Sequence, residues 1–321
     1  MTNIDLRSLR PEDLDKVVTI DAENSGRVRR SFYDKRLEIA LAAPESLITC
    51  AATVEGELIG FSFVRIEDGA FGINERIAVI DVIGVAKAYR QGGVATLMME
   101  ELERRMTKQS IKNIRTMIDW SDTGLTGYFS AAGFKLVPSI VVNRECESQP
   151  SFDGGDPESP RYQDGANNDY VSLFRDTIPV RTMKESDLAG IVKVDKKLTG
   201  NDRTAFYRSK ISEVLNESGI RVSLVVEQDN TVVGFAMVRL DYGEFGQMEP
   251  SAVLDTLGVN PEYHRSGVGK ALLSQLMVNL SALQVNNIQT QVHWESFGLL
   301  EFLSNCGFKA TQNLVLNKSL P

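Results

Sequence analysis

Short runs of apolar residues along the chain predict β-strands. Residues 4–9 form the first run, and residues 58–66 and 232–240 each follow a two-residue turn signal. Residues 77–85 and 252–259 are nearly continuously apolar and rich in β-branched side chains. Because strands covered on both faces show such runs, we expect these two segments to be central strands of a sheet.

A helical period replaces the strand pattern after each central strand and the Gly-rich turn that follows it. Apolar residues then recur every three or four positions, as on the face of a helix that packs against a sheet. The residues concerned are Val94, Leu97, Met98, Leu102 and Met106 in one segment and Val268, Leu272, Leu273, Leu276 and Leu280 in the other. We assign these side chains to the core and give them no ligand role.

The two series are copies of one another. Arg7 matches Arg181, and the same offset of 174 residues joins matching residues across nearly the whole of each half. The matches include Phe32-Tyr33 with Phe206-Tyr207, Gly84-Val85 with Gly258-Val259, Trp120 with Trp294, and Gly133-Phe134 with Gly307-Phe308. Each copy is predicted to run β-α-α-β-β-β-α-β-α-β-β, a mixed α/β domain.

The duplication predicts the domain boundaries. We expect an N-terminal domain at 1–145, a linker at 146–176 and a C-terminal domain at 177–321, because a unit of this length is a domain and not a solenoid repeat. Pro, Gly, Asp, Ser and Asn dominate the linker, which leaves little to bury. A short strand is predicted at its end, at 170–174.

Composition and charge exclude several classes of protein. The net charge of −8 argues against nucleic acid or an anionic membrane as partner, since either would favour a basic face. The three cysteines form no CxxC pair, which predicts reduced thiols, and two histidines are too few for a typical metal site. The N-terminus lacks the pattern of a signal peptide, and no apolar run approaches membrane-spanning length. We therefore expect a cytoplasmic protein without a metal.

The turn after each central strand carries the candidate chemistry. The two turns are Tyr89-Arg90-Gln91-Gly92-Gly93-Val94-Ala95 and Tyr263-His264-Arg265-Ser266-Gly267-Val268-Gly269-Lys270. Amide groups at the start of the following helix point outward, and small residues let a phosphate approach them closely. Neither turn has the Walker or the dinucleotide-binding spacing of glycines. The pattern therefore predicts an anion site of another kind.

These turns resemble motif A of the GNAT N-acetyltransferases, which runs V-x-P-x-[QR]-x-x-G-x-[GA]. The matching segments begin at Val85 and Val259, and Gly133-Phe134 and Gly307-Phe308 lie where the family has a terminal Gly-Phe pair. The resemblance covers both halves and leaves out only the linker. It implies two tandem GNAT domains, each with a mixed sheet that splays after the central strand and with helices on its faces.

The resemblance also implies a donor site for acetyl-CoA, with no metal. Pantetheine would enter the splay and pair with the main chain around Ile83 and Val85, or around Leu257 and Val259. The pyrophosphate would lie on amides of the two turns, and the corresponding residues are Arg90, Gln91, Gly92, Gly93, Val94 and Ala95 in the first copy and His264, Arg265, Ser266, Gly267, Val268, Gly269 and Lys270 in the second.

Each turn departs from the motif at one place. The first copy has Ala86-Lys87 where Pro is usual, and it ends the motif on Ala95. The second copy keeps Pro261 and both glycines but has His264 where Gln or Arg is usual. We expect both turns to bind and the C-terminal copy to be the one that turns over.

Transfer to an amine needs a base, because an amine is mostly protonated at neutral pH. Asp81 and Asp255 lie within the apolar strands, where an unpaired charge is costly. Strand alternation predicts that they share a face with the pantetheine-binding residues. We interpret them as general bases, with a structural carboxylate as the alternative.

The remaining catalytic groups are less well marked. The family often has Tyr four residues before the Gly of Gly-Phe, but Phe129 and Leu303 occupy those positions. Tyr128 is adjacent in the first copy and is our candidate acid for the leaving thiolate, with water as the alternative. Main-chain N–H on the central strand would stabilise the oxyanion. Trp120 and Trp294 either line an acceptor pocket or pack in the core.

We therefore expect a CoA-dependent N-acyltransferase, most simply an N-acetyltransferase, that transfers acetyl directly to a primary amine. The acceptor is a small molecule or a protein amino group, with no nucleic acid or membrane as partner, and the protein is a monomer or homodimer. Two alternatives stay open. One is a non-catalytic acyl-CoA-binding or regulatory protein, and the other is an enzyme like the tandem-GNAT mycothiol synthases.

Overall fold

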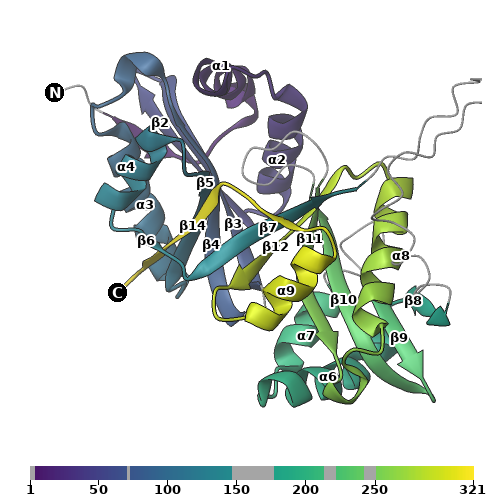
Figure 1. Cartoon of the computed structure of the whole chain (residues 1–321). Helices are drawn as coiled ribbons and strands as arrows, with labels where there is room; N and C mark the ends of the chain where they lie inside the picture. Colours follow the sequence, from purple (N-terminus) through teal and green to yellow (C-terminus); the bar gives the residue numbers. More distant parts are fainter. Residues whose placement is uncertain (1–3, 71–72, 147–176, 213–221, 242–250) are drawn as a thin grey trace, which may run out of the picture.

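The computed structural model describes residues 4–70, 73–146, 177–212, 222–241 and 251–321, and it shows two similar halves side by side (Figure 1). The first half contains β1 (Asp5–Arg7), α1 (Leu14–Ser25), α2 (Arg30–Ala42), β2 (Leu47–Val54), β3 (Glu57–Ala70), β4 (Ile73–Val85), α3 (Val94–Lys108), β5 (Asn113–Asp119), α4 (Thr123–Ala131), β6 (Lys135–Leu136) and β7 (Ser139–Glu145). This order is the one that the sequence predicts.

The second half repeats this order. It contains β8 (Val180–Thr182), α6 (Leu188–Thr199), α7 (Thr204–Ser212), β9 (Leu224–Gln228), β10 (Thr231–Asp241), β11 (Ser251–Val259), α8 (Val268–Ala282), β12 (Asn287–His293), α9 (Phe297–Asn305), β13 (Lys309–Ala310) and β14 (Asn313–Ser319). The bounds of α1 and α6, α3 and α8, and β5 and β12 agree at the offset of 174. The predicted strand at 170–174 lies outside the described residues.

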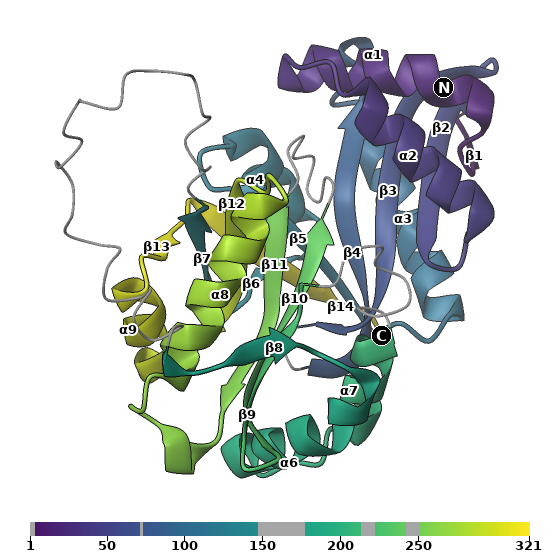
Figure 2. The same cartoon turned by 90° about the vertical axis from the view of Figure 1, so that its right-hand side faces the viewer.

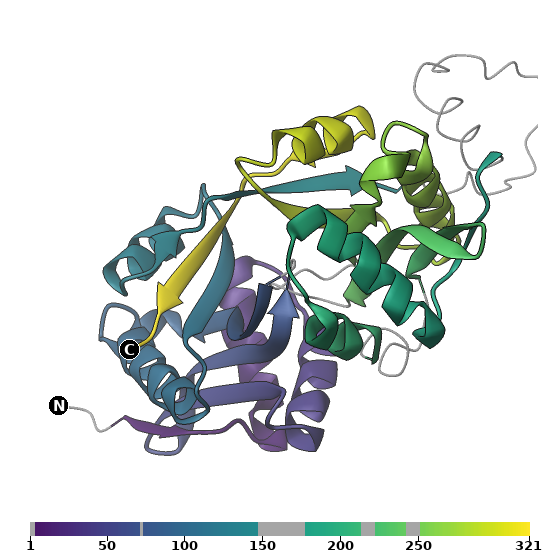
Figure 3. The ribbon, with the colours of Figure 1, turned by 90° about the horizontal axis from the view of Figure 1, so that it is seen from below.

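Each half forms a seven-stranded sheet, but the two sheets exchange their last long strands. The orders are β1-β2-β3-β4-β5-β14-β6 and β13-β7-β12-β11-β10-β9-β8. β14 pairs with β5 and β7 pairs with β12, each antiparallel over seven residues. Figure 3 shows yellow β14 reaching into the blue half while teal β7 lies along the other sheet. Each sheet therefore contains one strand from the other side of the linker. The domain boundaries at 1–145 and 177–321 describe the repeat in the sequence and stay a prediction.

Helices cover both faces of each sheet. In Figure 2, α1 and α2 lie in front of β2 and β3, and α3 lies behind them. The predicted apolar stripe of α8 is fully buried, and so is that of α3 with one exception. Leu97 is 39% exposed, and Met99 is buried in its place. The prediction for Leu97 was wrong because residues 98, 99, 102 and 106 define a face rotated by about one residue.

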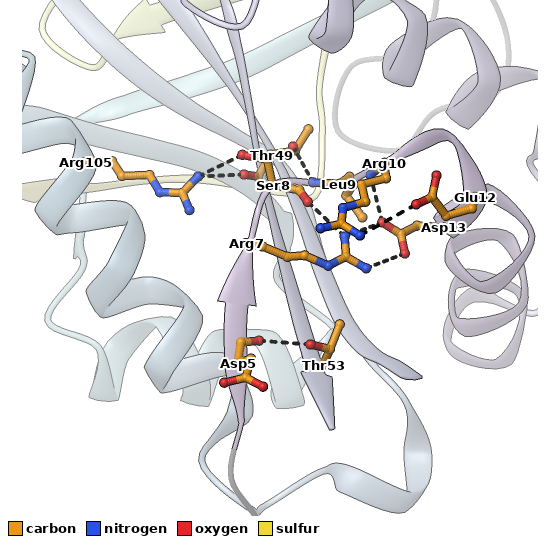
Figure 4. Close-up of polar contacts among 10 residues, drawn as sticks. All are labelled: Asp5, Arg7, Ser8, Leu9, Arg10, Glu12, Asp13, Thr49, Thr53 and Arg105. Atoms are coloured by element: carbon orange, nitrogen blue, oxygen red, sulfur yellow. Dashed lines mark hydrogen bonds and ion pairs between the residues drawn. The ribbon is translucent and has the colours of Figure 1, made fainter. Parts of the chain in front are cut away.

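A half-buried ion pair fixes the start of each half. Arg7 donates to both carboxylate oxygens of Asp13, at 2.6 and 2.8 Å, and the amide of Arg10 donates to the same carboxylate at 2.7 Å (Figure 4). Arg181 and Asp187 repeat the bidentate pair at 2.8 Å for both bonds. Burial opposes the charge of Asp13, but these donors outweigh it and lower the pKa of the carboxyl. The pair joins the first strand to the first helix in both copies.

The central strands diverge from their parallel neighbours, as predicted. β4 pairs with β5 only from Ile77 to Ile80, and β11 pairs with β12 only from Ser251 to Val253. A threonine hydroxyl makes a last contact in each copy, and Thr290 Oγ1 donates to Leu254 O at 2.7 Å. Beyond this point one edge of each central strand is not paired with the neighbouring strand. The opening lies directly before the Gly-rich turn.

Candidate functional site

The two Gly-rich turns have the same backbone. Gly93 and Gly267 begin α3 and α8 with φ of 80° and 92°, and Gln91 and Arg265 also have positive φ at 63° and 61°. A non-glycine residue rarely adopts the left-handed region at a helix start, so the sequence needs Gly there. Both turns therefore direct the first amides of a long helix toward the splay, as an anion site requires.

A large cavity of about 1020 Å³ occupies the splay of the second half. Predicted donor-site residues on its wall are Leu257, Val259, His264, Arg265, Gly267, Val268, Gly269 and Lys270. Asp255 lies on the same wall. Ser266 is not on the wall, because its hydroxyl turns back and donates to Tyr263 O at 2.6 Å. The cavity therefore connects the turn, the open edge of β11 and the candidate base.

The corresponding gap of the first half contains polar side chains. Asn24 Nδ2 donates to Val85 O at 3.3 Å, Arg90 Nε donates to the same oxygen at 3.4 Å, and Arg90 also bonds to Asn24. In the second half Leu198 replaces Asn24 and lines the cavity. There His264 Nε2 lies 2.9 Å from Val259 O. Val85 O thus accepts from two side chains in the first half. Its counterpart Val259 O lies against one histidine ring nitrogen in the second half.

Asp81 and Asp255 lie on a different face of the sheet from that predicted. The registers of β3–β4 and β10–β11 shift opposite them, so each aspartate occupies a β-bulge. Leu257 and Val259 pack with the core on the α8 side, whereas Asp255 pairs with Lys210 of α7. The prediction of a shared face was wrong because the bulge interrupts the alternation. The bulge directs both carboxylates toward the helix pair on the opposite side.

The two aspartates have different partners. Asp81 has a fully buried carboxylate, which accepts from Arg65 Nε at 2.8 Å and lies 3.3 Å from Arg36. Asp255 lies 3.4 Å from Lys210 Nζ and borders the cavity. Two guanidinium groups hold Asp81 in place as a charged structural group. Asp255 differs in that it borders the cavity, with 5% of its side chain exposed.

Tyr128 is held at the start of α3. Its hydroxyl donates to Ala95 O at 2.8 Å, and burial raises its pKa to about 12. In the second half Phe302 takes this position, and an added Cβ at Gly269 would lie 3.0 Å from its ring. The tyrosine therefore contacts the predicted donor turn through a hydroxyl whose proton is already engaged.

Sequence reasoning missed two groups on the cavity wall. Asp195, Arg203 and Tyr207 form a cluster in which Tyr207 donates to Asp195 at 2.8 Å and Arg203 Nε donates to it at 2.8 Å. Burial raises the pKa of Tyr207. Asp21, Arg29 and Tyr33 repeat the cluster in the first half, so it supports the fold of both copies.

The second missed group is Thr256. Its hydroxyl is buried without a hydrogen-bond partner, and the residue lies on the cavity wall beside Asp255. Val82 is its counterpart in the first half, where it packs against the apolar core on the α1–α2 side. A comparison of the two copies at the offset of 174 would have found this difference in the sequence.

The other predicted features are exposed. Trp120 and Trp294 are 59% and 48% exposed, so neither is a packed core residue, and Trp294 is not on the cavity wall. No cluster of His, Cys, Asp or Glu side chains suited to a metal occurs in the ranges that the structure describes. Within the same ranges, no helix is long and apolar enough to cross a membrane.

Comparison with known proteins supports the interpretation of both halves. The family model described as the acetyltransferase (GNAT) family matches residues 14–134 and 194–308. No curated protein sequence matches the chain.

Three solved structures share the fold of the whole chain. A GCN5-related N-acetyltransferase from Sphaerobacter thermophilus is 14% identical, with a TM-score of 0.64 over 99% of this chain and 96% of its own. A tandem GNAT protein from the clavulanic acid biosynthesis pathway is 12% identical, with a TM-score of 0.62 over 99% of both chains. A fungal multidomain β-N-acetylglucosaminidase with a glucosamine N-acetyltransferase region is 15% identical, with a TM-score of 0.66, and this chain spans 38% of its length.

Proposed function

The chain belongs to the acetyltransferase (GNAT) family, and on that premise we propose that it transfers an acetyl group from acetyl-CoA directly to a primary amine, at one site in its C-terminal half. The observation that carries the proposal is the cavity that joins the turn at His264–Gly269 to Asp255. A GCN5-related N-acetyltransferase and a tandem GNAT protein with the same fold support the class of activity.

The donor would occupy the open edge of β11 and the adjoining turn. Within the described residues, the ladder with β12 ends at Val253 and the last β12 contact is at Leu254, so main-chain groups of Leu257 and Val259 are available to the pantetheine amides. The pyrophosphate would bind the first amides of α8, with Arg265 and Lys270 on the same wall to offset its charge. Because His264 Nε2 lies against Val259 O, its ring must turn away when pantetheine binds.

Asp255 is the proposed general base. The nitrogen lone pair of the neutral amine attacks the thioester carbon, a C–N bond forms and the C–S bond breaks. The proton that leaves the nitrogen passes to the Asp255 carboxylate, directly or through one water. Lys210, at 3.4 Å, orients that carboxylate. The departing thiolate of CoA takes a proton from water, since Leu303 occupies the family's tyrosine position and its neighbour Phe302 supplies no acid either.

The N-terminal half is proposed to support the structure and not to turn over. Asn24 and Arg90 donate hydrogen bonds to Val85 O. Two arginines form ion pairs with Asp81, and the Tyr128 hydroxyl donates to Ala95 O. Donor binding there would have to break several polar contacts. In place of the expectation from the sequence that both turns bind, we propose that the full chain binds one equivalent of CoA with high affinity.

A screen of amine acceptors with acetyl-CoA, followed by release of free thiol, tests the activity. Calorimetric titration of the full-length protein with CoA and acetyl-CoA tests the donor site separately. We expect one equivalent per chain, and a saturating ligand at about 100 times its Kd should stabilise the protein by about 2.7 kcal/mol. Absence of binding of either compound at millimolar concentration would contradict the CoA assignment.

A second candidate is a regulatory protein that binds acyl-CoA without turnover. The lack of a free phenol at either acid position favours it, because Tyr128 is engaged and position 302 is Phe. One equivalent of bound acetyl-CoA, without thiol release for any acceptor, would support this candidate over the enzyme.

A further inference from the structure

A second, smaller cavity of about 50 Å³ lies where the two sheets meet. Its wall includes side chains from both halves, with Arg65 and Glu67 of β3, Arg115 of β5 and Arg239 of β10. Gln289 and Gln291 of β12 add two amide groups. The wall thus carries three guanidinium groups and one carboxylate, and none of these residues takes part in the proposed transfer.

The carboxylate on this wall is already used by two arginines. Glu67 lies 2.5 Å from Arg65 and 3.4 Å from Arg239, so it forms an ion pair within its own half and another across the junction. Burial opposes its charge, but Arg239 and Arg65 outweigh that effect and lower the pKa of Glu67 to about 2. Arg65 also pairs with Asp81 behind the wall. These carboxylates balance Arg65 and Arg239.

Arg115 is the third arginine of the wall, and it shares neither of these ion pairs. Its Nε is buried without a hydrogen-bond partner, and no carboxylate within the described ranges forms an ion pair with it. Burial lowers the pKa of this partly buried guanidinium, and the opposing effect of Glu67 and Glu75 does not outweigh it. A buried charge is costly unless a partner satisfies it.

The fold itself does not require a charge at this position. Gln289 is the counterpart of Arg115 at the offset of 174, and it lies on the same wall in the second half. A neutral amide therefore occupies the matching place in β12. The charge of Arg115 is specific to one side of the junction.

We propose that this cavity binds one small inorganic monovalent anion of the size of chloride, with Arg115 as its principal ligand and Arg239 and Gln289 beside it. One anion would balance the remaining guanidinium and accept from its Nε. A water needs about 10–15 Å³, so the volume suits a small ion with little accompanying water and excludes a nucleotide or an organic phosphate. The site would join the two sheets through an ion that contacts both.

The test uses the full-length protein without CoA, so its outcome is independent of the proposed enzymatic activity. Unfolding temperature is measured over a series of sodium bromide concentrations at constant ionic strength, with sodium gluconate as the bulky replacement. We expect a saturating rise of about 2–4 °C. Crystals grown in bromide should show an anomalous peak next to Arg115.

Three variants make the test specific. Arg115→Gln copies the residue of the second half and should abolish both the saturating rise and the anomalous peak. Arg104→Gln removes an exposed arginine of α3 with the same change of charge and should keep both. Glu67→Gln removes the competing negative charge and should enlarge the response to bromide.

The outcomes of these measurements distinguish an anion site from a general effect of salt. A saturating response that Arg115→Gln removes and Arg104→Gln retains supports the anion site. A response that is linear in bromide, or equal in the two arginine variants, would overturn it in favour of general salt effects. An empty cavity or one filled with water in the bromide crystals would overturn it as well.

Discussion

The two halves of this protein share a backbone and differ in the side chains that surround the splay. The turn conformations, the bulges and the helix bounds agree at a constant offset. Asn24 becomes Leu198, Val82 becomes Thr256 and Arg36 becomes Lys210. These exchanges remove polar groups from the pantetheine gap, add one hydroxyl near the aspartate and replace a guanidinium with an amine. Duplication has thus preserved the framework, while a few residues distinguish the two sites.

The largest expected difference concerns the two glycines at the helix starts. Gly267→Glu should reduce activity below detection, because a side chain and a negative charge would enter the phosphate site. Gly93→Glu is the matched control, since both glycines have positive φ and incur similar backbone strain. Its rate per folded molecule should stay near wild type. If Gly93→Glu is the more damaging change, the halves have been assigned the wrong way round.

The aspartates should separate catalysis from structure. Asp255→Asn is expected to lower kcat by about 10²- to 10⁴-fold with little change in CoA affinity, as loss of a general base does. Asp81→Asn should affect the rate less and stability more, by about 3–5 kcal/mol, because Arg36 and Arg65 lose a buried partner. Urea unfolding and pH–rate profiles measure the two effects. Equal rates in wild type and Asp255→Asn at every pH would make Asp255 structural.

Thr256 gives a smaller contrast. Thr256→Val copies Val82 and should raise KM for the acceptor by about 10-fold while leaving the Kd of CoA unchanged. Stability should rise by about 1 kcal/mol, because an unpartnered buried hydroxyl is removed. The reverse change, Val82→Thr, should destabilise the protein without altering KM. An unchanged acceptor KM in Thr256→Val would show that the hydroxyl on the cavity wall does not contact the acceptor.

The smallest effect should be equal in the two halves. Arg7–Asp13 and Arg181–Asp187 lower the pKa of their aspartates, so each pair stabilises the protein above pH ~4 and loses that contribution as pH falls further. Asp13→Asn and Asp187→Asn should each cost about 1 kcal/mol at pH 7 and almost nothing at low pH. Chemical unfolding at pH 7 and pH 3 measures this. A cost that is the same at both pH values would show that charge is not its cause.

Much of the fold could be predicted because the repeat aligns two independent versions of each element. The order of elements, the splay and the positions of both turns follow from this alignment, and the GNAT family match confirms the class. The face of Asp81 and Asp255 could not be predicted, because a bulge depends on the hydrogen bonding of the neighbouring strand. Leu97 was misplaced for a related reason, since the stripe of α3 fits two rotations and only packing chooses between them.

The exchange of β7 and β14 was also beyond sequence reasoning. Ser139-Ile140-Val141-Val142-Asn143 and Asn313-Leu314-Val315-Leu316-Asn317 have the same alternation, so each could complete either sheet. The alternation of apolar and polar residues therefore does not predict whether β7 pairs with β5 or with β12. The choice depends on the path of the chain after β6 and β13, which a strand pattern does not encode.

The exchange also sets an order of assembly during synthesis. Asn113 of β5 meets Ser319 of β14, 206 residues later, so the first sheet cannot be finished until β14 has been synthesised and has left the ribosome. Until then the outer edge of β5 is available to any strand that pairs with it, and its own neighbour β7 is the nearest candidate. A chain that stops before β14 should therefore lack a strand of the half that was made first.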